Sequence, residues 1–173
     1  FLSIGPEKVE PPHLPLSRRG VLLIHGPAGS GKSTVVKKAA TMLLSVVRED
    51  WRDKEGHKLV YIHVNLPLLV NPTSDMVREA LTRPYTMRDS QIFELKEQIQ
   101  AQGSKIRVVV SLDGVAELKT SYRNKNLFTT NSLEEWRPAD PKNEGLHLQW
   151  PKVIMLCRTE MLTGDSYMNQ FLP

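Results

Sequence analysis

Residues 20–34 read "GVLLIHGPAGSGKST", and this stretch decides the fold because an apolar run passes directly into a glycine-rich loop. Residues 21–24 are continuously apolar, which is typical of a strand that is buried on both faces. From Lys32 onward, apolar residues recur at spacings of three and four and predict a helix that runs to about Trp51. The three glycines between residues 26 and 31 therefore form a tight connection between a strand and a helix.

This connection fits the pattern G-x-x-x-x-G-K-[S/T] and lies in the strand–loop–helix context that the motif requires. Glycines let successive backbone N–H groups point at one phosphate, and the start of a helix adds partial positive charge there. Lys32 adds a full charge for the β- and γ-phosphates, Ser33 can bind Mg²⁺, and Thr34 is expected at the α-phosphate. An incidental glycine-rich turn is the alternative, which the eight-residue match and its flanks disfavour. The predicted nucleotide-binding residues are Gly26, Pro27, Ala28, Gly29, Ser30, Gly31, Lys32, Ser33 and Thr34.

The rest of the chain alternates between strand and helix patterns. Strands are predicted at residues 59–64, 106–112 and 152–157, which read "LVYIHV", "IRVVVSL" and "KVIMLC". Ser74 is the predicted N-cap of a short helix, and a second helix is expected at residues 90–102. Ser132 stands three residues before Glu135, which is the spacing of a capping box. This alternation predicts an α/β domain with a mainly parallel sheet.

Two carboxylates follow the strand at 106–112, in the stretch "SLDGVAEL". Because the carboxyl ends of parallel strands face one crevice, Asp113 is expected to bind a metal ion together with Ser33. Glu117 is expected to orient the attacking water as a catalytic base. An ordinary Asp-Gly turn is the alternative for Asp113, and a solvated surface position is the alternative for Glu117.

Arg158 comes directly after the last predicted strand, in "KVIMLCRTE". A permanent positive charge at that edge of the sheet could reach a γ-phosphate or link the nucleotide state to a neighbouring element. The alternative is a surface arginine that pairs with Glu160. The candidate catalytic residues are therefore Glu117, Lys32 and Arg158.

Together, "GPAGSGKST", "VVVSLDGVAEL" and "KVIMLCRTE" resemble the motifs of NACHT-type domains of the STAND class of signalling NTPases. The resemblance implies a three-layer P-loop fold of the additional-strand type. The roughly eighty residues between Lys32 and Asp113 are similar to the spacing in P-loop ATPases of that type, whereas nucleotide kinases usually carry their metal-binding carboxylate on the strand next to the loop strand. It further implies ATP or ADP with Mg²⁺, slow hydrolysis, a switch role in a larger multidomain protein, and self-association. Two residues depart from the family pattern. Ala116 replaces the first of two acidic residues, leaving Glu117 as the second carboxylate, and Leu156 replaces a common threonine.

Composition sets wider limits on the fold and its partners. The 173 residues are 40% hydrophobic, which is enough for one packed core. No apolar run is long enough to cross a membrane, and a net charge of +4 with interspersed signs gives no reason to expect nucleic acid. A single cysteine, Cys157, is compatible with a reducing compartment, so we expect a cytoplasmic protein.

The expected organisation is an extended, proline-rich lead-in at 1–19, followed by a P-loop core at 20–173 that is truncated at its C-terminal end. The chain begins with Phe and is expected to be a piece of a longer protein. Two functional alternatives stay open, a scaffold that binds nucleotide without hydrolysing it and a P-loop kinase that acts on a small molecule.

Overall fold

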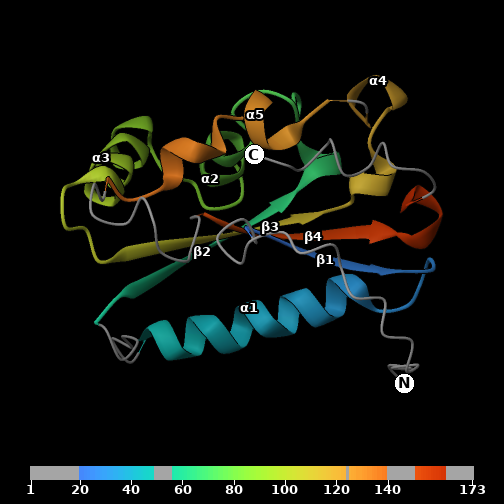
Figure 1. Cartoon of the computed structure of the whole chain (residues 1–173), viewed down its shortest axis with the longest axis horizontal. Helices are drawn as coiled ribbons and strands as arrows, with labels where there is room; N and C mark the ends of the chain where they lie inside the picture. The colour runs from blue at the N-terminus through green and yellow to red at the C-terminus, as the bar shows by residue number, and fades with distance from the viewer. Residues whose placement is uncertain (1–19, 49–55, 124, 140–150, 163–173) are drawn as a thin grey trace, which may run out of the picture.

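The computed structural model of the chain describes residues 20–48, 56–123, 125–139 and 151–162, in which a parallel sheet lies between two helical layers (Figure 1). Its four strands are β1 (Val21–Gly26), β2 (Lys58–Asn65), β3 (Ile106–Asp113) and β4 (Lys152–Arg158). They are arranged in the order β1-β4-β3-β2, and every neighbouring pair is parallel. The predicted α/β fold is therefore confirmed, and β4 is the additional strand between β1 and β3.

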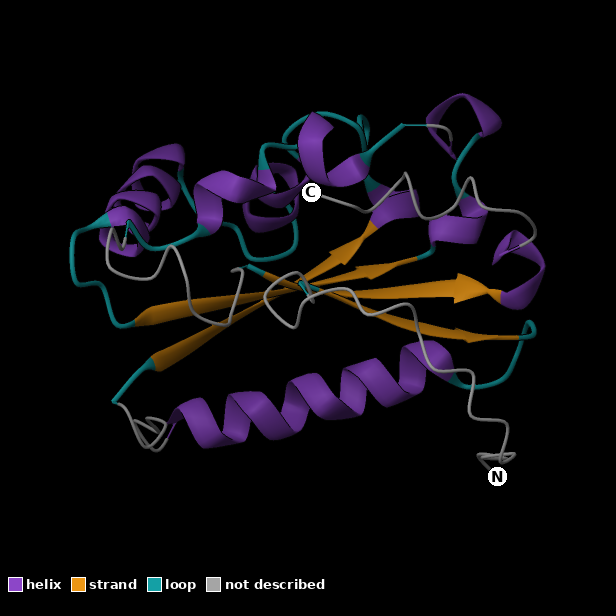
Figure 2. Cartoon of the chain, in the orientation of Figure 1, coloured by secondary structure: helices purple, strands orange, loops and turns teal. Residues whose placement is uncertain are grey.

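The helices cover the two faces of the sheet unequally (Figure 2). Helix α1 (Lys32–Arg48) lies along one face. The opposite face carries α2 (Met76–Thr82), α3 (Asp89–Gln100), α5 (Leu127–Thr130) and the 3₁₀ helix η4 (Leu133–Trp136). Shorter elements follow the strand ends, namely η2 (Leu66–Leu68), η3 (Val115–Glu117), α4 (Thr120–Arg123) and η5 (Thr159–Leu162).

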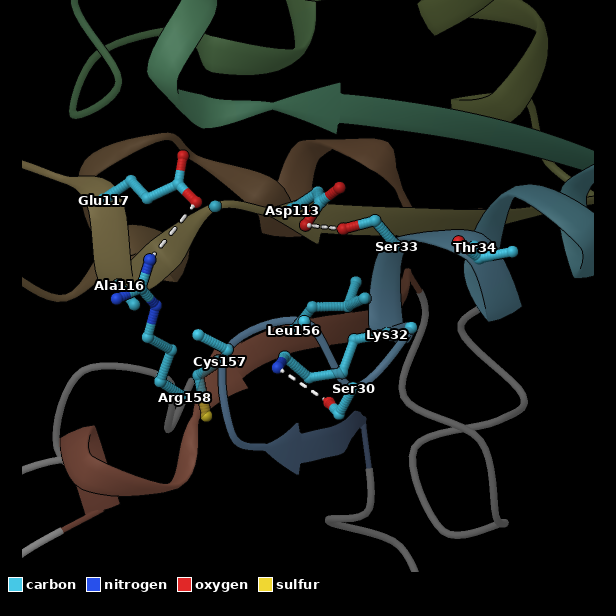
Figure 3. A pocket seen from close by; sticks show the side chains of 14 residues that line it. Ser30, Lys32, Ser33, Thr34, Asp113, Ala116, Glu117, Leu156, Cys157 and Arg158 are labelled. Atoms are coloured by element: carbon cyan, nitrogen blue, oxygen red, sulfur yellow. Dashed lines mark hydrogen bonds and ion pairs between the residues drawn. The ribbon is translucent and has the colours of Figure 1, made fainter. Parts of the chain in front are cut away.

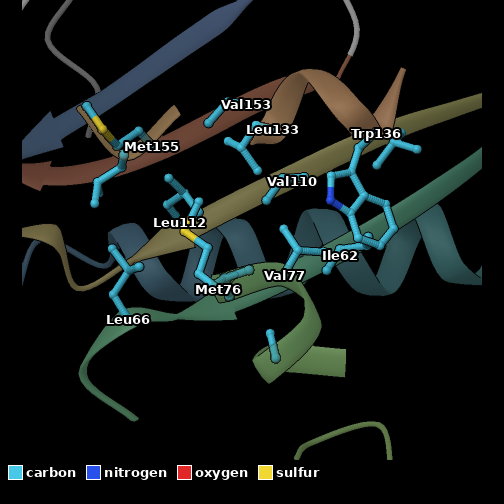
Figure 4. Close-up of a cluster of buried hydrophobic side chains, with 14 of the residues drawn as sticks. Ile62, Leu66, Met76, Val77, Val110, Leu112, Leu133, Trp136, Val153 and Met155 are labelled. Carbon is cyan, nitrogen blue, oxygen red and sulfur yellow. The ribbon is translucent and has the colours of Figure 1, made fainter. Parts of the chain in front are cut away.

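The sheet separates two apolar clusters, because successive side chains of a strand point to opposite faces. The larger cluster packs the sheet against α2, α3 and η4, and includes Ile62, Met76, Leu112, Trp136 and Met155 (Figure 4). Trp136 is only 1% exposed, and burial of a large apolar side chain contributes about 1.5–3 kcal/mol to stability. This packing holds the strand ends of the carboxyl edge in fixed positions.

The smaller cluster lies under α1 and consists of Val36, Tyr61 and Leu156, with Ala40 packed against it. Val35, which belongs to the same predicted apolar pattern, is 59% exposed and lies outside this cluster. Among the described side chains of α1, the contact with the sheet thus involves Val36 and Ala40 but not Val35. It nevertheless anchors the first turns of α1 directly behind the glycine-rich loop.

Two predicted helix caps are wrong. The N-cap of α2 is Asp75, not Ser74, and its φ is +55°. The N–H of Met76 instead donates to Oδ1 of the buried Asn131 at 2.8 Å, so a side chain from a distant segment performs the capping. Ser132 precedes a 3₁₀ helix, has a φ of +47° and makes no side-chain cap, since the Glu135 N–H donates to its carbonyl at 3.0 Å. The Glu135 carboxylate binds Lys96 and is not part of a capping box.

Some expectations concern residues outside the described part of the chain. These are the lead-in at 1–19 and the end of the first helix near Trp51, since α1 is described to Arg48. Within the described ranges, no helix is long and apolar enough to cross a membrane.

Candidate functional site

Three connections meet at the carboxyl edge of the sheet, those that follow β1, β3 and β4 (Figure 3). They surround a pocket of about 320 Å³, which is within the range of small-molecule sites. The pocket is lined by residues 28–34, 113–114, 116–117 and 156–158. The structure therefore brings together the three sequence segments from which the candidate site residues come.

The loop between β1 and α1 has the backbone conformation that its glycines permit. Gly29 and Gly31 have φ values of +75° and +82°, which are disfavoured for residues with a Cβ atom. The chain then enters α1, and the N–H of Val35 donates to the Gly31 carbonyl at 2.9 Å. Backbone N–H groups at the start of this helix have no partner within the helix, so the loop and the helix end together can bind an anion.

Lys32 is held by the loop itself. Its Nζ donates to the carbonyls of Gly26 and Pro27, at 2.8 and 2.7 Å, and to the Ser30 hydroxyl at 3.2 Å. Gly26 and Pro27 are not among the residues that line the pocket, although the sequence assigned them to nucleotide binding. Their carbonyls instead accept from Lys32 Nζ and orient the lysine.

The Ser33 hydroxyl donates to Asp113 Oδ1 at 3.0 Å, across 80 residues of sequence (Figure 3). Asp113 ends β3, and Ser33 lies in the first turn of α1. A hydroxyl and a carboxylate oxygen are suitable ligands for Mg²⁺, which commonly takes one or two protein oxygens and completes its shell with phosphates and water. Among the described residues no group of three or more His, Cys, Asp or Glu could hold a metal by itself.

Glu117 and Arg158 face each other across the pocket, with Arg158 Nη2 at 3.9 Å from Glu117 Oε1. Arg158 ends β4 and pairs in register with Gly26, while Glu117 ends η3. The sequence suggested Glu160 as the alternative partner of the arginine, but the ion pair in the structure is with Glu117. Their side chains are 47% and 57% exposed, so the pair is accessible to solvent and to a ligand.

Gly114 also lines the pocket, and the sequence analysis did not identify it as a site residue. Its φ is +82°, and a Cβ atom there would lie 2.4 Å from Pro67 Cδ. Glycine thus allows η3 to start close to the segment after β2, which sets the position of Glu117. The Asp-Gly dipeptide, which is common in turns, was the available signal.

A polar network centred on Ser111 lies two residues before Asp113 on β3, on the side of the sheet that α1 covers. Ser111, which is fully buried, accepts a hydrogen bond from the Tyr61 hydroxyl at 2.7 Å, and its Oγ lies 2.8 Å from His63 Nδ1. Burial lowers the pKa of His63, as does the nearby Lys37, while the Asp113 carboxylate opposes the shift. Burial also raises the pKa of Tyr61. No local sequence motif predicts this network, because its residues come together only through the pairing of β2 with β3.

Cys157 forms part of the pocket wall but is only 3% exposed. Burial raises the pKa of its thiol, and the charge of Lys32 opposes that shift. The thiol therefore stays neutral and packs as a small apolar side chain.

Comparison with known protein families agrees with this geometry. A family model described as an AAA domain matches residues 15–143, which is most of the chain. Comparison with curated proteins gives no match. The matched region contains the phosphate loop, Asp113 and Glu117, while β4 and Arg158 lie beyond it. The family match and the glycine-rich loop both indicate nucleotide binding, and the chain belongs to the AAA domain family of P-loop NTPases.

Proposed function

We propose that this domain binds ATP or ADP with Mg²⁺ and acts as a nucleotide-dependent switch in a larger protein. The observation that carries the proposal is the 3.0 Å hydrogen bond from Ser33 to Asp113, beside Lys32. It joins two oxygen ligands suited to Mg²⁺ at the mouth of a loop suited to phosphate. The resemblance of the motifs to NACHT-type STAND domains supports ATP and ADP as the nucleotides.

In the proposed complex the loop backbone at 28–34 binds the phosphates, and Lys32 Nζ reaches the β- and γ-phosphate oxygens. A Mg²⁺ ion held by Ser33 and Asp113 would neutralise charge on these phosphates. During hydrolysis, water forms a bond to the γ-phosphorus as the bond to the bridging oxygen breaks. Glu117 would accept the proton that this water loses, and Arg158 would stabilise charge on the γ-phosphate.

The positions of these groups support the proposed switch role. Lys32 in the first turn of α1 and Arg158 at the end of β4 would contact the γ-phosphate directly, and Asp113 at the end of β3 would contact it through Mg²⁺. Loss of the γ-phosphate would therefore change contacts to several elements at once. We also propose self-association through this domain in the full-length protein, and a cytoplasmic location. Both of these rest on the NACHT resemblance and the unpaired cysteine.

Calorimetric titration with Mg–ATP and Mg–ADP, repeated in EDTA, tests the binding step. Lys32→Ala should weaken binding about 100-fold, because it removes a charge-assisted contact with the phosphates. Asp113→Asn should remove most of the dependence on Mg²⁺. Lys38→Ala is the matched control, since Lys38 is an exposed lysine of α1 that does not line the pocket. Failure of the wild type to bind either nucleotide would refute the proposal.

A scaffold that binds nucleotide without hydrolysing it is the second candidate, and one observation favours it. Ala116 lines the pocket at the position where the resembling family usually carries an acidic residue. Single-turnover release of phosphate from ATP distinguishes the two, with Glu117→Gln as the comparison. Release that is clear in the wild type and slow in Glu117→Gln would support hydrolysis, whereas no release from a bound wild type would support the scaffold. The topology gives no support to a kinase, because β4 separates the phosphate-loop strand from the strand that ends in Asp113.

A further inference from the structure

Strand β2 is the outermost strand at one end of the described sheet, because the order β1-β4-β3-β2 places β3 on one side of it only. Its eight residues pair with β3 without interruption, from Lys58 beside Ile106 to Asn65 beside Asp113. Neither a proline nor a bulge breaks this run, although outer strands commonly carry such features against unwanted pairing. β2 is therefore a long and regular outer strand.

The backbone groups of β2 point alternately toward β3 and away from it. The Lys58 N–H donates to the Lys105 carbonyl at 2.8 Å, so Lys58 points toward β3. Residues 59, 61 and 63 then point their N–H and C=O groups away from β3. The His63 N–H shows this direction, because it donates to the Tyr85 hydroxyl at 3.4 Å. Within the described ranges, no other hydrogen bond satisfies these outward groups of β2.

We propose that a second copy of this chain pairs with this edge, β2 against β2 and antiparallel, about a two-fold axis at Tyr61. A row of backbone donors and acceptors is satisfied by another extended strand, which identifies the kind of partner. The axis places Tyr61 opposite its own copy and Leu59 opposite His63, so each outward N–H meets an outward carbonyl. It also places Lys58 opposite Val64, so no two like charges face each other across the pair. This match of the edge to itself is the reason for naming a second copy.

Tyr85 covers part of the edge in the single chain. It is 45% exposed, it lies between α2 and α3, and its hydroxyl occupies the His63 N–H that the second copy would need. A hydrogen bond of 3.4 Å is long, so a strand carbonyl can replace it. Because the edge must first lose this contact and offers few hydrogen bonds in return, we expect a weak, reversible pair with a Kd of about 10–500 µM.

The inference gives a surface to the self-association proposed above and rests on that part of the proposed function alone. β2 ends beside Asp113, so the antiparallel pair would hold two nucleotide sites at opposite edges of one continuous sheet. The pair itself needs no nucleotide. A wild type that fails to bind nucleotide would therefore refute the nucleotide switch and leave the pairing of β2 to be decided by its own test.

Sedimentation velocity of the 173-residue chain, without nucleotide and from about 5 to 500 µM, measures the association. Leu59→Pro removes an outward N–H but no hydrogen bond to β3, so the sheet should persist while the affinity of the pair falls more than about tenfold. Leu59→Ala is the matched control, because it keeps the N–H and should change the affinity less than about threefold. Tyr85→Phe frees the His63 N–H and should strengthen the pair about three- to tenfold.

Amide hydrogen exchange on the wild type gives a second measurement that needs no variant to fold. The amides of residues 60, 62 and 64 bond to β3 and should be protected at every concentration. Those of residues 59 and 61 should exchange freely in dilute solution and become protected as the concentration rises. A wild type that stays monomeric, or association that Leu59→Pro leaves undiminished, would overturn the proposal. Protection of residues 59 and 61 in the dilute chain would also overturn it, because the chain would then cover its own edge.

Discussion

The Ser111→Ala substitution removes only a hydroxyl group, but it should lower the free energy of unfolding of the domain strongly. Ser111 is fully buried on β3, two residues before Asp113. Its Oγ accepts from the Tyr61 hydroxyl at 2.7 Å and contacts His63 Nδ1 at 2.8 Å. Alanine keeps most of the volume but leaves both partners without this oxygen.

The size of the effect follows from the burial of these partners. A buried polar group that loses its only hydrogen bond costs about 1–3 kcal/mol. Tyr61 is 8% exposed, so its hydroxyl contributes the full free-energy loss of an unsatisfied buried group. His63 is only part-buried, so a hydrogen bond to water can replace part of what its ring loses. We therefore expect a loss of about 2–3 kcal/mol, or about 5–10 °C in Tm for a chain of this length.

Urea unfolding followed by circular dichroism measures this loss, with Tyr61→Phe and the double variant completing a cycle. Tyr61→Phe alone should cost about 1 kcal/mol, and the double variant should cost less than the sum because the orphaned hydroxyl is gone. Ser74→Ala, at an exposed serine that caps nothing, should change stability by less than about 0.5 kcal/mol. A Ser111→Ala loss as small as that of the control, or strict additivity in the cycle, would refute the reasoning.

Three further outcomes follow from the same structure. Gly114→Ala should lower the free energy of unfolding by about 1–3 kcal/mol, measured in urea, because its φ is +82° and the new Cβ would contact Pro67. Ser30→Ala should raise nucleotide affinity about two- to tenfold in calorimetry, since it removes one of the oxygens that compete with phosphate for Lys32. The pKa of His63 is lowered in the fold, so the unfolded chain binds more protons and stability should fall as the pH drops below about 6.5. His63→Gln should flatten that part of a plot of urea midpoint against pH, and an unchanged slope would contradict the assignment.

Much of the fold could be predicted because its signals are local. Continuous apolar runs such as residues 21–24 indicate strands covered on both faces, and the helix after Lys32 has a clear period. Once the sheet is parallel, the carboxyl ends of its strands must share an edge, which is why Asp113 and Arg158 could be expected near the loop. Their roles in binding and hydrolysis stay predictions.

Features that depend on contacts between distant segments could not be predicted. The cap of α2 comes from Asn131, which is 55 residues away from Met76 and has no local signature. The contact between Ser111 and His63 likewise requires the exact pairing of two strands. In the first case a local capping pattern at Ser74 gives way to a tertiary hydrogen bond, and in the second there is no local pattern at all.

The central place of β4 has a consequence for how the protein is made. On the ribosome, residues 26–34 and Asp113 are synthesised well before Lys152–Arg158, yet β1 and β3 become joined only when β4 enters between them. At about 5–20 residues per second, the roughly forty residues after Asp113 take about 2–8 s to appear. During that interval β3 can already pair with β2, whereas β1 still lacks β4 beside it and the phosphate site is incomplete. A nucleotide that needs both the loop and Asp113 in place can therefore stabilise the fold only after the last strand has been translated.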